Sequence, residues 1–294
     1  MPKLIFVGLA ILCSLHIHAQ YKKENSMSQY FENRSLWNPS LTGADGNRLH
    51  LLHNRSWFGF DGAPVLTAFT GHYLFGKNSA GGLQITSDAS GIVYRTTGAL
   101  NYAYRISFDK TTQLRLGFNL LFNSERIDNR KLDAAAINDP LILSNINQEP
   151  GFDANFGAYY ETKRLSVGAS FYRLKEMFSA NKRNNADINL MRGAITYDLI
   201  DEDTEEKLKL TSLGMVSFYR NTKAVYDIGL RMNYAPVTAL LVYQTTGNIK
   251  MGLGLNIQKA ATVNFYYNIG TGKYEVPVQQ LEIGVNYRFT DNKK

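Results

Sequence analysis

The stretch Leu281-Glu282-Ile283-Gly284-Val285-Asn286-Tyr287-Arg288-Phe289 decides the fold. Its odd-numbered residues are large and apolar, whereas its even-numbered residues are charged, polar or small. Because the side chains of a β-strand alternate between two faces, this stretch predicts a strand with one apolar and one polar face. Segments of the same kind recur from about residue 48 to the end of the chain, and turn-forming residues separate them.

The recurring pattern predicts an all-β chain of about fourteen strands. They are expected at 48–57, 64–75, 80–87, 93–107, 112–122, 152–160, 164–173, 189–199, 207–219, 224–234, 237–245, 248–257, 261–269 and 280–289. An even number of strands with alternating faces is typical of an antiparallel transmembrane barrel of the bacterial outer membrane. The alternative is a soluble β-sandwich or barrel, whose exposed face is usually rich in Thr, Lys and Glu. Here the polar faces instead carry repeated glycine and asparagine, such as Gly117 and Asn119, which favours a crowded lumen.

The connections between these strands provide an independent test of the barrel. If the chain enters the barrel from the periplasm, every second connection faces the periplasm, and such turns are short in outer-membrane barrels. The connections that would face outward include all the long ones, at 123–151, 174–188 and 270–279. This asymmetry predicts an outer-membrane barrel over residues 48–290, with its long loops at the cell surface.

The N-terminus has the features of a secretory signal peptide. Lys3 precedes an apolar run from Leu4 to Leu15, and Ala19 offers a small residue at a cleavage site. We therefore predict a signal peptide at residues 1–19; a buried N-terminal helix is the alternative. Cys13 is the only cysteine, so the mature chain is expected to lack disulfides and thiolate chemistry. Lipidation of Cys13 would need a small preceding residue, but Leu12 stands there.

Charge and polar clusters exclude several classes of function. The net charge is +7, but the basic residues are spread along strands and loops rather than clustered, so no nucleic-acid binding is expected. The acidic run 201–206 lacks the spacing of a calcium loop and is predicted to be a solvated turn. Ser56 and His72 could meet across a hairpin as a nucleophile and its base, which would suit an enzyme acting on lipid. This is the weakest alternative, and the sequence predicts no enzyme, no catalytic residue, no metal and no cofactor.

Residues 20–47 do not fit a bare barrel. Tyr30-Phe31 and Trp37 need burial, while Asn38-Pro39 and Gly43 break regular structure. With no second domain to cover them, this irregular segment is expected in the barrel lumen or at its periplasmic mouth. The first external hairpin follows, with Gly59 and Gly62 permitting tight turns.

Two N-terminal motifs resemble the signature of the PorP/SprF family of the type IX secretion system of Bacteroidetes. The first is Asn38-Pro39-Ser40-Leu41-Thr42-Gly43, and the second runs from Arg55 through Trp57, Gly59 and Gly62 to Pro64. Weaker similarities are Asn101-Tyr102-Ala103-Tyr104-Arg105 and Leu116-Gly117-Phe118-Asn119, so that the resemblance covers nearly the whole mature chain. Ser56 is a departure, since Gln is frequent before the tryptophan.

The resemblance implies an outer-membrane barrel that binds a secreted surface protein, notably a gliding adhesin with a C-terminal sorting domain, and that helps secrete or anchor it. Periplasmic or outer-membrane secretion components are further expected partners, besides membrane lipid. The long external loops are the predicted contact surface, through Asp139, Pro140, Leu141, Ile142, Met177 and Phe178. A lid over the barrel mouth is the alternative for these apolar residues, and an outer-membrane channel for small or apolar solutes is the alternative function.

Overall fold

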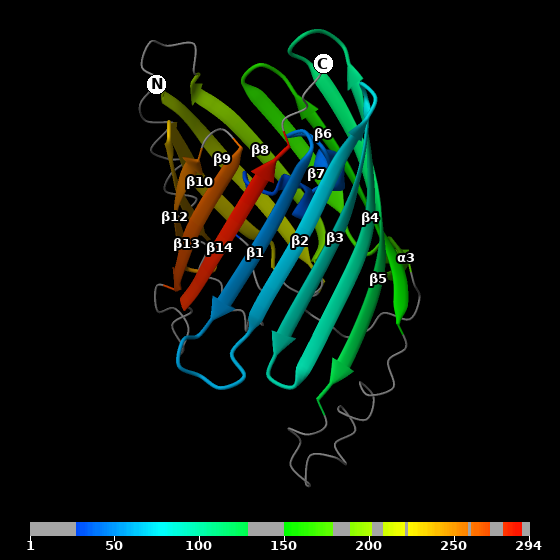
Figure 1. Ribbon diagram of the computed structural model, residues 1–294, viewed down its shortest axis with the longest axis vertical. Helices are drawn as coiled ribbons and strands as arrows, with labels where there is room; N and C mark the ends of the chain where they lie inside the picture. The colour runs from blue at the N-terminus through cyan, green and yellow to red at the C-terminus, as the bar shows by residue number, and fades with distance from the viewer. Residues whose placement is uncertain are drawn as a thin grey trace.

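The computed structural model describes residues 28–128, 150–178, 189–201, 208–220, 223–257, 260–270 and 279–289, and it shows a closed antiparallel β-barrel (Figure 1). Each of the fourteen strands pairs with its neighbour along the chain, and the first pairs with the last. The predicted signal peptide at 1–19 and the predicted contact residues Asp139–Ile142 lie outside the described residues. The predicted fold class is confirmed.

The strands lie close to their predicted positions. Their bounds are β1 Arg48–Ser56, β2 Val65–Phe75, β3 Ser79–Ser90, β4 Val93–Ser107, β5 Gln113–Ile127, β6 Gly151–Glu161, β7 Leu165–Phe171, β8 Asn189–Ile200, β9 Leu208–Tyr219, β10 Val225–Tyr234, β11 Val237–Gln244, β12 Asn248–Ile257, β13 Ala261–Gly270 and β14 Gln279–Arg288. Closure between β1 and β14 runs from Arg48↔Arg288 to Ser56↔Gln280, so neither strand leaves an open edge.

Because apolar and polar residues alternate along each strand, the barrel has an apolar outer wall and a polar lumen. Leu100, Phe118 and Ile228 are exposed on the outside, whereas Asn101, Asn119 and Asp227 are buried inside. An outward belt of large apolar side chains matches the hydrocarbon layer of a membrane, and closure satisfies every strand's hydrogen bonds there. Among the described residues, no helix is both long and apolar enough to cross a membrane.

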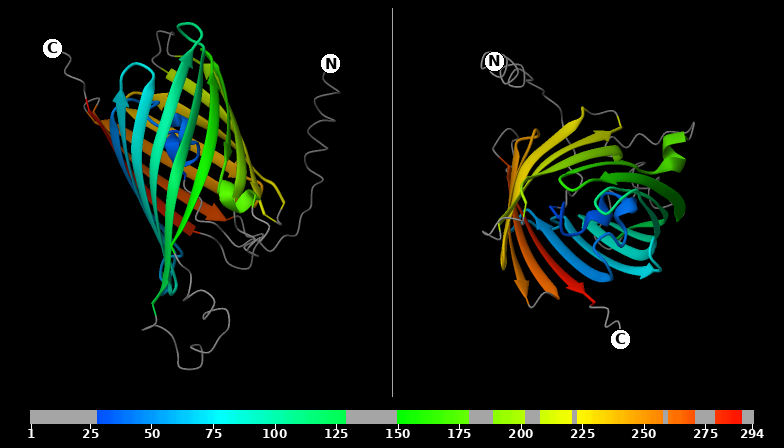
Figure 2. Two further views of the ribbon diagram at one scale, coloured as in Figure 1. Left: turned by 90° about the vertical axis from the view of Figure 1, so that its right-hand side faces the viewer. Right: turned by 90° about the horizontal axis from the view of Figure 1, so that it is seen from above.

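Two strands extend three residues or more beyond their predicted ends. β3 continues to Ser90 and β5 to Ile127, where the sequence loses its alternation because both faces become polar. Pairing with β4 maintains the strand there: Arg95 Nε lies 2.6 Å from Glu125 Oε2, and Thr97 donates to Asn123 Oδ1 over 2.8 Å. These strands therefore project past the apolar belt on the side of the long connections (Figure 2). Residues 123–127, predicted as loop, belong to this projection.

The connection after β7 also differs from the prediction. β7 ends at Phe171, and a short helix, α3 (Leu174–Phe178), follows instead of an irregular loop. Arg173 turns the chain with a φ of 52°, and its N–H donates to Asn155 Oδ1 over 2.7 Å. Lys175 N–H donates to Asp153 Oδ1 over 2.9 Å. Two side chains of β6 thus hold the start of α3 against the barrel wall.

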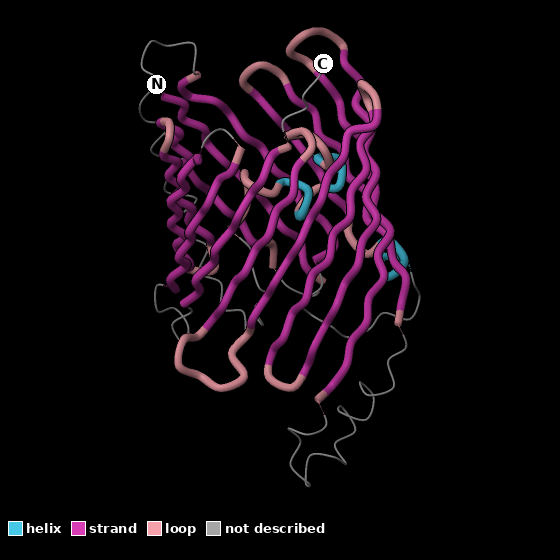
Figure 3. The backbone as a smooth tube through the Cα atoms, in the orientation of Figure 1, coloured by secondary structure: helices cyan, strands magenta, loops and turns pink. Residues whose placement is uncertain are grey.

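The segment preceding β1 lies inside the barrel. It contains two 3-10 helices, η1 (Arg34–Leu36) and η2 (Pro39–Leu41), which Figure 3 shows enclosed by the strands. We call residues 28–47 the luminal segment. Tyr30, Trp37 and Leu41 of this segment form a buried cluster with residues of the inner wall. The segment starts beside Glu282, near the external ends of β14 and β1, and it ends at the periplasmic end of β1.

Candidate functional site

The centre of the luminal segment is held by Asn38, which is fully buried. Its Oδ1 caps η2, accepting from the N–H and the hydroxyl of Ser40 over 3.0 and 2.7 Å. Its Nδ2 donates to the carbonyls of Ala158 and Ala169, a cross-strand pair of β6 and β7, over 3.1 and 3.3 Å. Pro39 at the first position of η2 fixes the turn without needing a donor. The Asn-Pro pair thus joins a helix cap to the wall.

Glycines of the wall make room for this motif. A Cβ on Gly117 would lie 2.6 Å from the carbonyl oxygen of Pro39, and one on Gly157 would collide with the Asn38 side chain. At the end of the motif, Gly43 lies so close to Ala80 that no Cβ fits between them. Glycine inside a strand is unfavourable unless another backbone approaches closely. At Gly117 and Gly157, the luminal segment makes this close approach.

A buried polar network fixes the other end of the segment, in the external half of the lumen. The N–H of Ser28 donates to both oxygens of Glu282 over 3.0 Å, and Asn54 Nδ2 donates to Oε2 over 2.9 Å. The Tyr30 hydroxyl donates to Asp227 Oδ1 over 3.3 Å and accepts from Lys250 Nζ. Burial and the Asp227 carboxylate raise the pKa of Tyr30, so its hydroxyl stays protonated as a donor.

Two ion pairs hold the middle of the segment and its periplasmic end. Glu32 Oε1 lies 2.6 Å from Arg231 Nη2, and the Arg231 guanidinium lies 5.0 Å from the Phe31 ring centroid. Within the segment, Arg34 Nη2 lies 2.8 Å from Asp45 Oδ1. Burial alone would raise the pKa of Asp45, but Arg34 and Arg48 outweigh it and lower this pKa to about 2. Asp45 is therefore ionised at neutral pH.

Backbone hydrogen bonds hold the first external hairpin in a defined conformation. Ser56 N–H donates to the Pro64 carbonyl and Trp57 N–H to the Gln279 carbonyl, each over 2.9 Å. Gly59 and Gly62 have φ values of 86° and 72°, which glycine adopts without strain. Trp57 has a φ of 48°, and a non-glycine residue in that region is a mark of functional or turn-related strain.

This hairpin presents aromatic side chains at the external mouth. Phe60 is 66% exposed, and Phe58 is exposed beside it. A surface hollow of about 320 Å³ is lined by Trp57, Phe60, Asp61, Gly62 and Ala63. The loop could therefore receive an apolar side chain of another molecule.

The structure separates the two halves of the family motif. Asn38, Pro39 and Gly43 lie in the periplasmic half of the lumen, whereas Trp57, Gly59, Gly62 and Pro64 form the external hairpin at the other end of β1. Arg55 lies on the exposed face of β1, between Val65 and Leu281. The motif thus describes two sites that the first strand links.

Among the predicted contact residues, Met177 and Phe178 lie in α3, and Phe178 is 82% exposed. The suggestion that Ser56 meets His72 is wrong. In the register of β1 and β2, His72 faces Arg48, which is eight residues from Ser56, or about 27 Å along the strand. His72 Nε2 instead lies 3.0 Å from the buried Ser35 hydroxyl.

Sequence reasoning missed the network around Asp227, Lys250 and Glu282. Each is a charged side chain that is buried on the inward face of a strand. Such a charge in a narrow barrel signals an interior partner, and the aromatic and acidic residues before β1 could have suggested which segment supplies it.

The fold and this polar lumen define an outer-membrane β-barrel occupied by its own N-terminal segment. Solved structures agree on the fold. They include Omp33 of Acinetobacter baumannii (8% identity, TM-score 0.50, covering 83% of this chain and 98% of that one) and the toluene transporters TbuX of Ralstonia pickettii (13%, 0.51, 87% and 93%) and TodX of P. putida (10%, 0.50, 88% and 95%). At such identities the likeness concerns the fold alone.

The family comparison is more specific. The family described as type IX secretion system membrane protein PorP/SprF matches residues 19–291, and the chain belongs to this family. No curated protein matches the chain in sequence. The protein is therefore a type IX secretion membrane protein of the outer membrane, as its sequence motifs predicted.

Proposed function

We propose that this barrel binds a secreted cell-surface protein, such as a gliding adhesin, through that protein's C-terminal sorting domain, and that it helps secrete or anchor this partner. The family implies such a role. The observation that carries the proposal is the occupied lumen: residues 28–47 are fastened along the inner wall by Asn38, by Glu32–Arg231 and by the Tyr30–Asp227–Lys250 contacts. A barrel filled in this way is suited to binding at its surface rather than to conducting solutes.

The external hairpin is our candidate for the contact surface. Its exposed Phe60 lines a hollow, and Phe58 is exposed next to it in the sequence. A hydrogen bond between Ser56 and Pro64 closes the hairpin, and one from Trp57 to Gln279 ties it to β14. Exposed aromatics on a rigid loop are favourable anchors for a protein partner, because little conformational freedom is lost on binding. The projecting ends of β3–β5 and the exposed Phe178 of α3 lie on the same side of the barrel and could extend this surface.

We further propose that the periplasmic mouth, where the luminal segment ends, faces other secretion components, and that the outer wall contacts only lipid. We propose no catalytic role. Within the described ranges, no three His, Cys, Asp or Glu side chains gather as ligands for a metal ion.

The test is affinity purification of the tagged barrel from its native outer membrane, followed by mass spectrometry. The unaltered barrel should recover a large surface protein that carries a C-terminal sorting domain. Phe60→Ala should weaken the binding behind that recovery by about thirtyfold, since a buried aromatic anchor is worth about 2 kcal/mol and 1.4 kcal/mol is a factor of ten. Phe108→Ala is the matched control, because Phe108 is 61% exposed in the opposite, periplasmic turn between β4 and β5.

Equal recovery with both variants would remove the hairpin from the contact surface. Recovery of the bare barrel alone, from gently solubilised membranes, would contradict the proposed function and favour a channel.

A further inference from the structure

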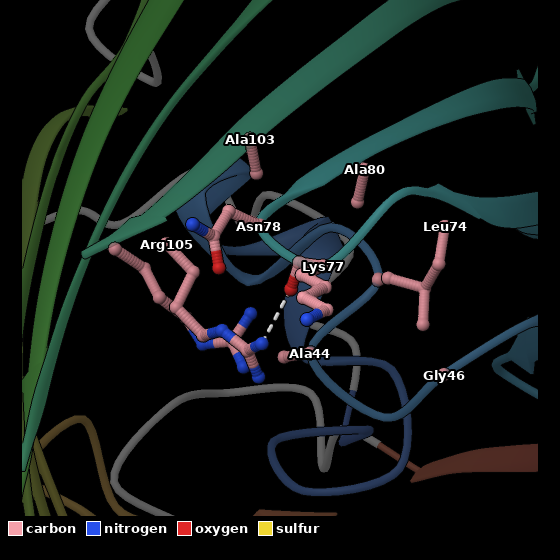
Figure 4. Close-up of a pocket in the computed structure, with 10 residues that line it drawn as sticks. Ala44, Gly46, Leu74, Lys77, Asn78, Ala80, Ala103 and Arg105 are labelled. Carbon is pink, nitrogen blue, oxygen red and sulfur yellow. Dashed lines mark hydrogen bonds between the residues drawn. The ribbon is translucent and has the colours of Figure 1, made fainter. Parts of the chain in front are cut away.

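A small cavity lies at the periplasmic mouth, between the end of the luminal segment and the wall. It has a volume of about 110 Å³. Its lining comes from Gly43, Ala44 and Gly46, from the turn between β2 and β3 with its flanking residues, and from the periplasmic ends of β4 and β5. Figure 4 shows Lys77, Asn78 and Arg105 around it, with Leu74 and Ala44 nearby.

The unusual feature of this cavity is a pair of arginines directly opposite each other. Arg105 of β4 and Arg115 of β5 are cross-strand partners, and both line the cavity. Like charges at directly opposed positions destabilise a sheet. Lys77 adds a third cation to the lining. A cluster of this kind needs a compensating negative charge.

The described residues supply only part of that charge. Neither arginine forms an ion pair with a described residue, and the buried Nε atoms of both lack a hydrogen-bond partner there. Arg105 Nη2 donates to the Lys77 carbonyl, which is a neutral acceptor (Figure 4). Two carboxylates act on Arg115 without forming an ion pair with it. Asp45 is paired with Arg34, and Glu161 accepts from the neutral Gln113 amide, so Glu161 keeps its charge but cannot balance three cations.

Arg115 is the more deeply buried of the two arginines. Its exposure is 8%, and no side-chain hydrogen bond ties it to the described part of the chain. Burying a charge without a partner is costly, and the cost falls when an ion of opposite sign binds. The arrangement therefore provides a preformed place for an anion.

We propose that this cavity is an oxyanion-binding site that receives one carboxylate or phosphate group from the periplasmic side, between Arg105 and Arg115. The planar guanidinium presents parallel N–H donors that match both groups. The cavity is small, about 110 Å³, which suits a single charged group with a few water molecules. The site takes a single charged group, such as an acidic side chain or terminus of a periplasmic polypeptide, or free phosphate.

The experiment is a binding titration on the purified full-length barrel in detergent micelles. Isothermal titration calorimetry with sodium phosphate and with sodium N-acetylglutamate, at constant ionic strength set with chloride, should show saturable binding of one anion per chain. Arg105→Gln and Arg115→Gln should each weaken it by about tenfold or more, since a charge-assisted hydrogen bond is worth roughly 1.5–3 kcal/mol and 1.4 kcal/mol is a factor of ten.

Arg95→Gln is the matched control. It removes an arginine from the same strand β4, at the external end, where Glu125 is its partner. Its anion affinity should equal that of the unaltered barrel. A melting curve in chloride checks the fold of each variant, and we expect Arg105→Gln to be as stable as the parent or more so, because it relieves the repulsion from Arg115.

The two anions distinguish the two sources. Tighter binding of N-acetylglutamate assigns the site to a polypeptide carboxylate, and tighter binding of phosphate assigns it to the free ion; either result supports the site. Absence of saturable binding of both anions would overturn the proposal. An equal loss in Arg95→Gln would also overturn it, since the effect would then be general screening.

Discussion

Asn38 and the glycines around it show how single residues set the interior of this barrel. A membrane barrel wall tolerates many residues on its inner face, yet Gly117 and Gly157 stand where any side chain would strike the Asn38–Ser40 turn. The same turn uses both ends of the Asn38 amide, one for its own cap and one for the wall. The Asn-Pro part of the family motif therefore packs closely against the backbone of the barrel wall.

Gly117→Ala is expected to disturb this fit. The added methyl would lie 2.6 Å from the Pro39 carbonyl oxygen, so the segment must shift, at a cost of about 1–3 kcal/mol. Thermal unfolding in micelles measures the loss of stability. Gly98→Ala is the control, because a Cβ there meets nothing within 4 Å and no change in melting is expected. Equal melting temperatures for the two variants would show that the segment does not pack against Gly117.

Asn38→Ala is expected to cost more than Ser40→Ala. The first removes the cap of η2 and leaves the Ala158 and Ala169 carbonyls without this donor, at about 1–3 kcal/mol for a buried unsatisfied group. The second removes only the hydroxyl donor to Asn38 Oδ1. Urea unfolding of the two variants ranks them, and the opposite ranking would contradict the bridging role of Asn38.

At the scale of elements, strand positions could be predicted because the membrane imposes alternation. Where a strand passes the apolar belt, alternation ends and the predicted strand stops too early, at Phe122 in β5 and at Ser87 in β3. Only pairing with β4, through contacts such as Arg95–Glu125, continues the strands there. α3 was missed for a similar reason, since its start depends on Asp153 and Asn155 of another strand.

The candidate site was predictable only in part. The aromatic residues of the luminal segment indicated that this segment is buried. Its polar partners, however, lie on strands that are far from it in the sequence. Tyr30 meets Asp227 and Lys250, and Glu32 meets Arg231, through the barrel's closure and register. A local sequence pattern cannot show which of these distant residues meet in the folded barrel.

The ion pair within the luminal segment gives it a defined pH dependence. Because the folded pKa of Asp45 is lowered to about 2, its stabilising effect is fully present above the unfolded value near 4 and is lost as the pH falls through about 2. In a Trp57→Phe background, the fluorescence of Trp37 should report loosening of the segment between pH 4 and pH 2. Asp45→Asn should remove this transition, and a transition that persists in Asp45→Asn would assign it to another group.

At the scale of the whole molecule, the barrel combines an apolar outer wall, an external aromatic hairpin and a lumen that holds the luminal segment. The first strand connects the two parts of the family motif, so the Asn38–Gly43 turn inside and the hairpin outside are close in sequence but lie toward opposite ends of the wall. This arrangement suits a protein that is held rigidly in the outer membrane and offers surfaces to partners on both sides.

Conductance in a planar lipid bilayer shows whether the luminal segment closes the barrel. The purified full-length barrel should insert without a steady open-channel current, while a variant that lacks residues 28–43 should conduct. A steady current from the full-length barrel, equal to that of the shortened variant, would show that the luminal segment leaves the lumen open and would favour a channel for solutes.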